Sequence, residues 1–319
     1  MNRAALLIRT HLLNDGVRAL IDGLRRDDAL DVFALVDERR GPLDFGDIPK
    51  IALAGDLPQS LGLYAETPNL MWRCGDYGLY AARQRLPEYQ AFWMMEPDVR
   101  IHAAKPLGLL GGFPPPDEVD FLAGSLRPAE SDWNWARTMD PAEGPIWRCL
   151  FPLVRLSARA IDIMLDERRR ASERFRVSGR DPVFWPNDEV FTASTLIRRG
   201  LVCRDLNDFG QVYDPANFSF WFPISERELA AGGQEGRIYH PVLSGQPYFT
   251  KLFRLANEQG NLEGLEQLID SLVGVEWTPE EALGHHRAIA FARSQLRLAG
   301  HPGDADSGDA TPDPPAARG

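Results

Sequence analysis

The fold is decided by residues 89–100, which read YQAFWMMEPDVR. The apolar run before Glu96 predicts a buried strand, and Pro97, which has no amide hydrogen, must end that strand or place it at a sheet edge. On extended backbone, Glu96 and Asp98 point to the same side, about 6.5 Å apart. Two carboxylates so placed can hold one hard divalent cation, whose other positions are shared with substrate phosphates. The stretch therefore predicts a metal site, and a strand-end turn with solvated carboxylates is the alternative.

Strand and helix patterns alternate on the amino-terminal side of this stretch. Residues 15–24 place apolar side chains at helical spacing, and Asp76 can cap a second helix over residues 77–85. Short apolar runs predict strands at residues 4–8, 30–36 and 51–54. This alternation predicts an α/β fold with a mostly parallel central sheet flanked by helices. In open sheets of that kind, ligands bind outside the carboxyl ends of the strands, where Glu96 and Asp98 would lie.

The segments after the stretch are less regular. Glycine, proline and tryptophan dominate residues 105–152, which predicts loops and irregular structure. A strand is expected at residues 151–156. The helix that Ser157 caps is expected to end in the solvated charged run ERRR at residues 167–170. Asn187 is expected to cap the next helix, because asparagine is a preferred helix cap.

We expect the chain to have three parts. The first is a catalytic domain over residues 1–255, and the second is a set of helices packed on it over residues 256–300. The sequence TPEE at residues 278–281 supports these helices, because it is a capping box with proline at the first helical position. Residues 301–319 lack apolar anchors and are expected to form a disordered tail.

The composition excludes several classes of protein. A formal net charge of −11 argues against nucleic-acid binding, which depends on clustered positive charge. An acidic protein that handles a diphosphate needs a metal ion or a few local arginines to offset the repulsion. No stretch approaches the roughly 20 apolar residues of a membrane span, and the first nine residues are too short for a signal-peptide core. We therefore expect no transmembrane segment and a cytoplasmic location. The three dispersed cysteines, expected to be buried free thiols, are Cys74, Cys149 and Cys203.

Residues 89–100 resemble the metal-motif strand of glycosyltransferases with the GT-A fold, and are most similar to a group with the pattern aromatic-Trp-x-x-Glu-x-Asp-Val-Arg. The likeness is specific over residues 72–100 and looser over residues 6–251. It implies a GT-A-like, Rossmann-like fold with a helical extension at the carboxyl end. It also implies that Asp98 is the principal ligand of a Mn²⁺ or Mg²⁺ ion that holds the diphosphate of a nucleotide sugar. Glu96 would be a direct or water-mediated ligand.

Residues later in the chain complete the implied site. Related folds often supply a third metal ligand from a late histidine at a strand end, which indicates His240, since imidazole suits manganese. A histidine bonded to backbone is the alternative. An inverting transferase also needs a carboxylate that removes the acceptor proton, commonly at the start of a helix after the metal strand. Asp188 and Glu189 fit that position, Asp188 slightly better, while acids in a first helical turn are also favoured by the helix dipole.

Contacts with a sugar donor and an acceptor are implied for further residues. Asp37 ends a predicted strand and would lie near the nucleoside, and its pairing with a neighbouring arginine is an equal alternative. A plain helix cap is the alternative for Asp76. The expected donor-binding residues are Arg9, Thr10, Asp37, Arg73, Asp76, Tyr77 and Lys251. The expected acceptor-binding residues, whose indole faces could stack on sugar rings or simply pack in the core, are Trp133, Trp135 and Trp185.

The sequence thus favours a metal-dependent glycosyltransferase that moves a sugar from a nucleotide diphosphate sugar to a glycan or other hydroxyl acceptor. A non-catalytic nucleotide-sugar or glycan-binding protein of the same fold is one alternative. A nucleotidyltransferase is another, but it needs a glycine-rich loop near the amino terminus to cradle phosphates. Gly16 is the only glycine before Gly23, so no such loop is visible.

Overall fold

The computed structural model describes residues 3–67, 69–220 and 223–258. The chain divides into two compact units, Met1–Val242 and Leu243–Gly319, and each is described by itself. In the second unit, the described structure is the helix α9, Gly245–Glu258. The helices expected over residues 256–300 and the tail expected over residues 301–319 lie, from residue 259 onward, outside the described residues.

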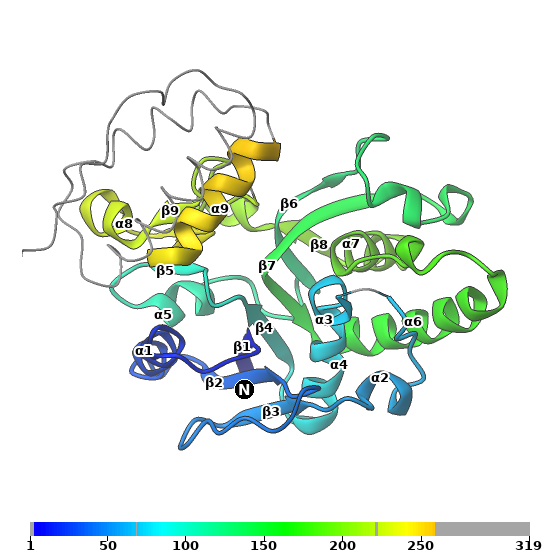
Figure 1. Ribbon diagram of the computed structural model, residues 1–319, viewed down its shortest axis with the longest axis horizontal. Helices are drawn as coiled ribbons and strands as arrows, with labels where there is room; N and C mark the ends of the chain where they lie inside the picture. The colour runs from blue at the N-terminus through cyan, green and yellow to red at the C-terminus, as the bar shows by residue number, and fades with distance from the viewer. Residues whose placement is uncertain (1–2, 68, 221–222, 259–319) are drawn as a thin grey trace, which may run out of the picture. The chain divides into compact units, whose positions relative to one another are not determined.

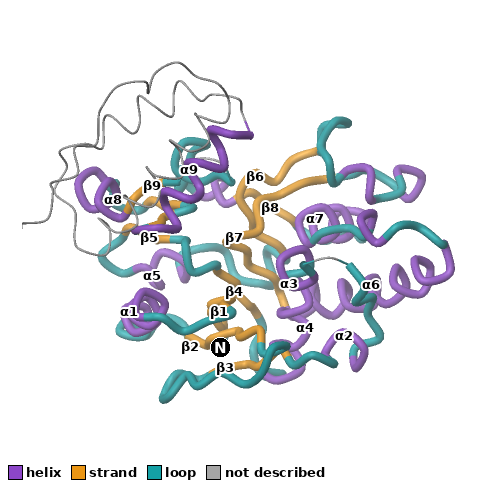
Figure 2. The backbone as a smooth tube through the Cα atoms, in the orientation of Figure 1, coloured by secondary structure: helices purple, strands orange, loops and turns teal. Residues whose placement is uncertain are grey.

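A seven-stranded sheet forms the centre of the first unit, in the order β3-β2-β1-β4-β7-β6-β8 (Figures 1 and 2). Four of its six neighbouring pairs are parallel, and β7 is antiparallel to both β4 and β6. The prediction of an α/β fold with a mostly parallel sheet is therefore confirmed. The strands are β1 Ala4–Thr10, β2 Asp31–Asp37, β3 Lys50–Leu53, β4 Ala91–Met95, β6 Phe121–Pro128, β7 Trp147–Ser157 and β8 Cys203–Asp205.

Helices cover both faces of this sheet and form one core on each face. Successive side chains of a strand point to opposite faces, so they enter different cores. In β1, Ala5 and Leu7 join a core with α4, α6 and α7, whereas Leu6 and Ile8 join a core with α1 and α5. Figure 1 shows these two groups of helices on opposite sides of the sheet. A strand buried on both faces is expected to be apolar throughout, as β4 is. The helices are α1 Asp15–Leu24, α2 Leu57–Ser60, α3 Leu70–Arg73, α4 Asp76–Arg85, α5 Pro106–Gly111, α6 Ala158–Ser178, α7 Asp188–Arg198 and α8 Glu226–Gly232.

Local capping signals fix where the long helices begin. The side chains of Ser157 and Asn187 accept backbone N–H groups at the starts of α6 and α7, which confirms both predicted caps. The cap predicted at Asp76 is wrong. Gly75 is the N-cap of α4, and Asp76 is the first helical residue. The physical reason is an ion pair in the core, since the Asp76 carboxylate accepts from the guanidinium of Arg168.

The prediction of irregular structure over residues 105–152 is confirmed for residues 112–120 and 129–146, and is wrong for the rest, where α5, β6 and the start of β7 lie. The prediction took glycine as a sign of loops, but Gly124 lies inside a strand. A Cβ placed on Gly124 in β6 would lie 2.7 Å from Cε1 of Phe218, so this glycine permits close packing and marks no loop. The cysteines are free, with Cys203 only partly buried. None of the helices in the described residues is long and apolar enough to cross a membrane.

Candidate active site

Three chain segments meet at the carboxyl end of β4. Glu96 follows the last residue of this strand, and Asp98 lies in the turn that leads into β5 (Arg100–His102). The strand β10 (Arg237–Tyr239) pairs antiparallel with β5, with Tyr239 opposite Arg100. This register brings His240, the residue after β10, back across the turn that carries Asp98. The amide of Val242 donates to the carbonyl of Asp98 at 2.7 Å and fixes that approach.

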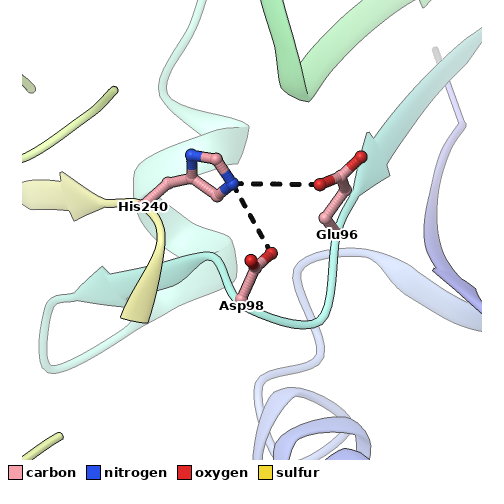
Figure 3. A group of neighbouring side chains, drawn as sticks. All are labelled: Glu96, Asp98 and His240. Carbon is pink, nitrogen blue, oxygen red and sulfur yellow. Dashed lines mark ion pairs between the residues drawn. The ribbon is translucent and has the colours of Figure 1, made fainter. Parts of the chain in front are cut away.

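Glu96, Asp98 and His240 form a compact cluster, which is hereafter called the metal cluster (Figure 3). The His240 Nε2 atom lies 3.6 Å from Asp98 Oδ1 and 3.8 Å from Glu96 Oε2. One ligand atom from each residue lies within 4.8 Å of the other two. The two carboxylates are about a quarter exposed, whereas His240 is buried. The cluster is therefore open to solvent on its acidic side and rigid on its imidazole side.

The geometry of the metal cluster fits a divalent cation. The His240 Nδ1 atom lies 2.8 Å from the carbonyl oxygen of Ser219. Because a carbonyl can only accept, Nδ1 carries a proton, which leaves Nε2 as the ring nitrogen that could bind a cation held by the two carboxylates. Metal–ligand bonds of about 2.0–2.2 Å place two ligands of one cation about 3–4 Å apart, which matches the observed separations. Two oxygens and one imidazole nitrogen suit Mn²⁺ or another transition metal.

Arg9 connects the metal cluster to the helix α7. Its guanidinium forms a short ion pair with Glu96 and lies 3.5 Å from Asp188 Oδ2. Burial acts to lower the pKa of Arg9, but the two carboxylates outweigh it and hold the pKa above its ordinary value. Arg9 therefore stays charged and balances two acids at the edge of the sheet.

Asp188 and Glu189 occupy the first turn of α7, and both are buried. The backbone N–H of Gly75 donates to Asp188 Oδ2 at 2.9 Å. Burial raises the pKa of Asp188 to about 7, although Arg9 acts in the opposite direction. Burial and the neighbouring Asp188 carboxylate raise the pKa of Glu189 well above its ordinary value. Glu189 Oε1 has no hydrogen-bond partner among the described residues. Both acids are thus shifted toward their protonated forms, and Asp188 is the one that faces Arg9.

Arg73, predicted to contact a donor, holds the segment before α7. Its guanidinium donates to the carbonyls of Val183 and Trp185 at 2.8 and 2.6 Å. Asp76 is fully buried and pairs with Arg168, whose guanidinium also donates to the carbonyl of Pro186 at 3.0 Å. Two arginines therefore fasten residues 183–186, and with them the position of Asp188.

The other predicted contact residues are placed as follows. The hydroxyl of the buried Tyr77 donates to the carbonyl of Tyr64 at 2.8 Å, inside the core. Asp37 accepts a hydrogen bond from Arg39 at 2.8 Å. Burial acts to raise the pKa of Asp37, but the bonds to Arg39 outweigh it and lower the pKa. The hydroxyl of Thr10 donates to a backbone carbonyl two residues ahead, at 2.7 Å. Lys251 belongs to the second unit, in α9. Tyr77, Asp37 and Thr10 are not among the residues of the metal cluster.

The predicted acceptor-binding tryptophans divide into two kinds. Trp133 and Trp135 are partly exposed, and each carries an arginine guanidinium on its ring, Arg148 at 4.7 Å and Arg73 at 4.8 Å from the centroids. Trp185 is only 1% exposed and packs in the core. The first two remain candidates for contact with a ligand, whereas a ligand could reach Trp185 only at the surface of a cavity.

Sequence reasoning missed the structural role of Arg168, which it assigned to a solvated run. Arg168 is fully buried. A signal was present, because Arg168 lies seven residues after Ile161 and four after Met164 and so shares their inward face of α6. The contact of Arg9 with Asp188 had no such signal, since the two residues are 179 positions apart.

No protein-family model matches this sequence, and neither does any curated protein. Among solved structures, the chain is similar to a glycosyltransferase involved in the glycosylation of the major capsid of PBCV-1, with 9% identity, over 75% of this chain and 91% of that chain, at a TM-score of 0.33. It is also similar to the galactosyltransferase LgtC, solved with donor and acceptor sugar analogues, with 12% identity, over 71% of this chain and 77% of that chain, at a TM-score of 0.37. Likenesses at these identities and TM-scores decide neither the fold nor the activity of this chain.

Proposed function

We propose that this chain is a metal-dependent glycosyltransferase, which moves a sugar from a nucleotide diphosphate sugar to a hydroxyl acceptor. The observation that carries the proposal is the meeting of Glu96, Asp98 and His240 at the carboxyl end of β4, joined through Arg9 to Asp188. The resemblance of residues 89–100 to the metal-motif strand of GT-A glycosyltransferases supports the same assignment.

The residues of the metal cluster have separate tasks in this proposal. Asp98 and Glu96 would supply oxygen ligands to a cation, and His240 would supply a nitrogen ligand that the Ser219 carbonyl holds in one orientation. A divalent cation bound there would neutralise charge on the departing diphosphate. Arg9 keeps Glu96 and Asp188 at fixed positions, so that the site is organised before the donor binds.

Asp188 is the proposed general base. It lies across Arg9 from Glu96, and its pKa of about 7 is near the value that suits a base at neutral pH. Glu189 is the weaker candidate, because its carboxyl group is held by Asn187 Nδ2 at 3.1 Å and not by Arg9. The exposed faces of Trp133 and Trp135 are the proposed contacts for an acceptor sugar.

One observation favours a second function, which is binding of a nucleotide sugar without turnover. The Asp188 side chain is only 5% exposed, and its Oδ2 atom already accepts from Gly75 and lies near Arg9. In the second function, this carboxylate has a structural role alone, which is to join α7 to the start of α4 through the amide of Gly75. The two functions share the metal cluster and differ in whether Asp188 takes part in chemistry.

Thermal unfolding with Mn²⁺ and a panel of nucleoside diphosphates tests the shared part of the proposal. We expect a stabilisation that needs metal and nucleotide together, of about 5–10 °C when the nucleotide is near 100 times its Kd. Asp98→Asn should remove it. Asp56→Asn, at an exposed acid whose side chain makes no cap bond, should keep it. Stabilisation that survives in Asp98→Asn protein contradicts the metal site.

An assay of the hydrolysis of UDP- and GDP-sugars, which measures the nucleoside diphosphate released, separates the two functions. In a transferase we expect Asp98→Asn to reduce release by about a hundredfold or more. Asp188→Asn should keep the metal-dependent thermal shift but slow transfer to an added acceptor. Binding that is intact in the wild type, with no release from any donor, favours the non-catalytic function.

A further inference from the structure

A cavity of about 600 Å³ lies away from the metal cluster, between residues 138–143, α6 and α7. Its lining includes none of Glu96, Asp98 and His240. The volume falls within the range of about 300–1,000 Å³ that is typical of sites for small molecules. The cavity therefore has room for a ligand that the proposed transfer reaction does not require.

The floor of the cavity is apolar and largely aromatic. Phe175 and Trp185 stand edge to face there, with ring centroids 5.1 Å apart at an interplanar angle of 73°. Phe191 lies beside them, and its other face covers the guanidinium of the buried Arg168 at 3.7 Å. Met139 and Ala171 complete the floor. The three rings are 8%, 1% and 3% exposed for Phe175, Trp185 and Phe191, so they offer the apolar body of a small ligand a limited area of contact.

The rim of the cavity is basic, and its acids are already engaged. Glu143 pairs with both Arg174 and Arg198, at 3.2 and 3.4 Å. Glu167 forms short ion pairs with Arg199 and Arg170. The third acid, Asp140, caps a short 3-10 helix by accepting the amide of Ala142 at 2.8 Å. Four arginines face three carboxylates around this cavity, although the whole chain carries a net charge of −11.

Arg180 is the rim arginine that stands apart. Among the described residues, it has no carboxylate within ion-pair distance. Its guanidinium lies instead over the rings of Phe175 and Phe184, 5.9 and 5.4 Å from their centroids. Arg137 lies over the same Phe184 ring at 5.5 Å. Arg180 lines the cavity, whereas Phe184 and Arg137 lie outside its lining, so Arg180 is the group that could donate hydrogen bonds to an anion in the cavity.

We propose that this cavity binds a small anion with an aromatic or apolar body. The body lies on the floor of Phe175, Trp185 and Phe191, and the anionic group lies at Arg180. A carboxylate, a sulfonate and a phosphate share the required chemistry. The site is distinct from the metal cluster, none of whose residues lines it.

The fluorescent dye 8-anilinonaphthalene-1-sulfonate, added to the folded full-length chain, tests the proposal. We expect saturable binding of one dye, which Arg180→Gln weakens about tenfold through the loss of a charged donor. Ala171→Phe fills the cavity and should remove the saturable signal. Arg26→Gln, at an exposed arginine of the turn after α1, is the matched control and should bind the dye like the wild type.

Competition identifies which part of the ligand is recognised. Phenyl phosphate should displace the dye at lower concentrations than inorganic phosphate does, because only the former has an apolar body. No saturable binding to the wild type overturns the proposal, and so does equal affinity in Arg180→Gln protein. Because Arg180 is exposed, that variant decides the question even if Ala171→Phe fails to fold.

Discussion

The ion pair between Asp76 and Arg168 is the interaction whose loss we expect to cost most. Both side chains are 0% exposed, and the guanidinium contacts the carboxylate twice, at 2.7 and 3.1 Å. The same guanidinium holds the carbonyl of Pro186 and packs under the ring of Phe191. Removing it leaves a buried carboxylate whose remaining side-chain donor is the hydroxyl of Tyr80.

Arg168→Met should therefore destabilise the unit Met1–Val242 by about 3–5 kcal/mol, which is the usual cost of leaving one partner of a buried pair uncompensated. Adding Asp76→Leu removes the stranded charge, and the double variant should recover most of the loss, because apolar replacement of a whole pair is often neutral. Arg170→Met is the matched control. Arg170 is 58% exposed, so its free energy of unfolding should change by about 0.5 kcal/mol or less.

Urea unfolding followed by tryptophan fluorescence measures these effects in the correct part of the chain, since every tryptophan except Trp277 precedes residue 243. A loss below about 1 kcal/mol in Arg168→Met protein, similar to that in the Arg170→Met control, would refute the reasoning. So would a double variant that is less stable than Arg168→Met alone. Either result would mean that the interior solvates the Asp76 carboxylate without its arginine.

Three further predictions concern the candidate active site. Burial raises the pKa of Asp188 from 3.8 to about 7, so folding favours the protonated acid. The stability that this gives is present below about pH 4 and is lost as the pH rises to about 7, so the free energy of unfolding should fall by a few kcal/mol across that window when divalent cations are absent. Asp188→Asn should remove this fall, and equal pH profiles of urea unfolding in the variant and the wild type would contradict the prediction. A Cβ on Gly75 would lie 1.7 Å from Arg9 Nη1 and 2.7 Å from Asp188 Oδ2, so Gly75→Ala should destabilise the protein by about 1–3 kcal/mol. Gly23→Ala, with nothing within 4 Å, should instead stabilise α1 by about 0.5–1 kcal/mol, and similar melting shifts in the two variants would exclude the proposed crowding. Asp98→Asn should lower Mn²⁺ affinity at least tenfold in a titration by electron paramagnetic resonance, and unchanged affinity would exclude Asp98 as a ligand.

The elements that sequence predicted well are those whose signals are local. The helix α1 shows apolar spacing, and α6 and α7 begin at Ser157 and Asn187, whose side chains cap them. The strand β4 is apolar throughout and ends before a proline. The hairpin of β6 and β7 could not be predicted in the same way, because its glycine serves the packing of Phe218 and its register shifts at Gly124. Long-range packing overrode the local composition there.

The residues of the candidate site also differ in whether a local sequence signal predicted them. Glu96 and Asp98 were visible as a pair, because two residues on one extended segment share a side. His240 was inferred from resemblance, and its approach depends on the pairing of β10 with β5, which no local pattern specifies. Asp188 reached the site through contacts with residues more than 100 positions away, including the amide of Gly75. Such contacts are consequences of the whole fold.

The contact between Arg9 and Glu96, by comparison, follows from strand register. In the parallel pair of β1 and β4, Ile8 lies opposite Met95. The next positions along the two strands are therefore Arg9, near the end of β1, and Glu96, the residue after β4, and both lie at the same carboxyl edge. Any side chain at position 9 would stand beside Glu96, so a basic residue there offsets one of the acids that end β4.

Solvent exposure distinguishes these acids from the acid in the core. Glu96 and Asp98 are about a quarter exposed, whereas Asp76 is 0% exposed and is paired with Arg168. A carboxylate enclosed with an arginine cannot exchange its partner without opening the core, whereas partly exposed carboxylates can take up and release a cation. The carboxyl end of β4 therefore suits a removable divalent ion.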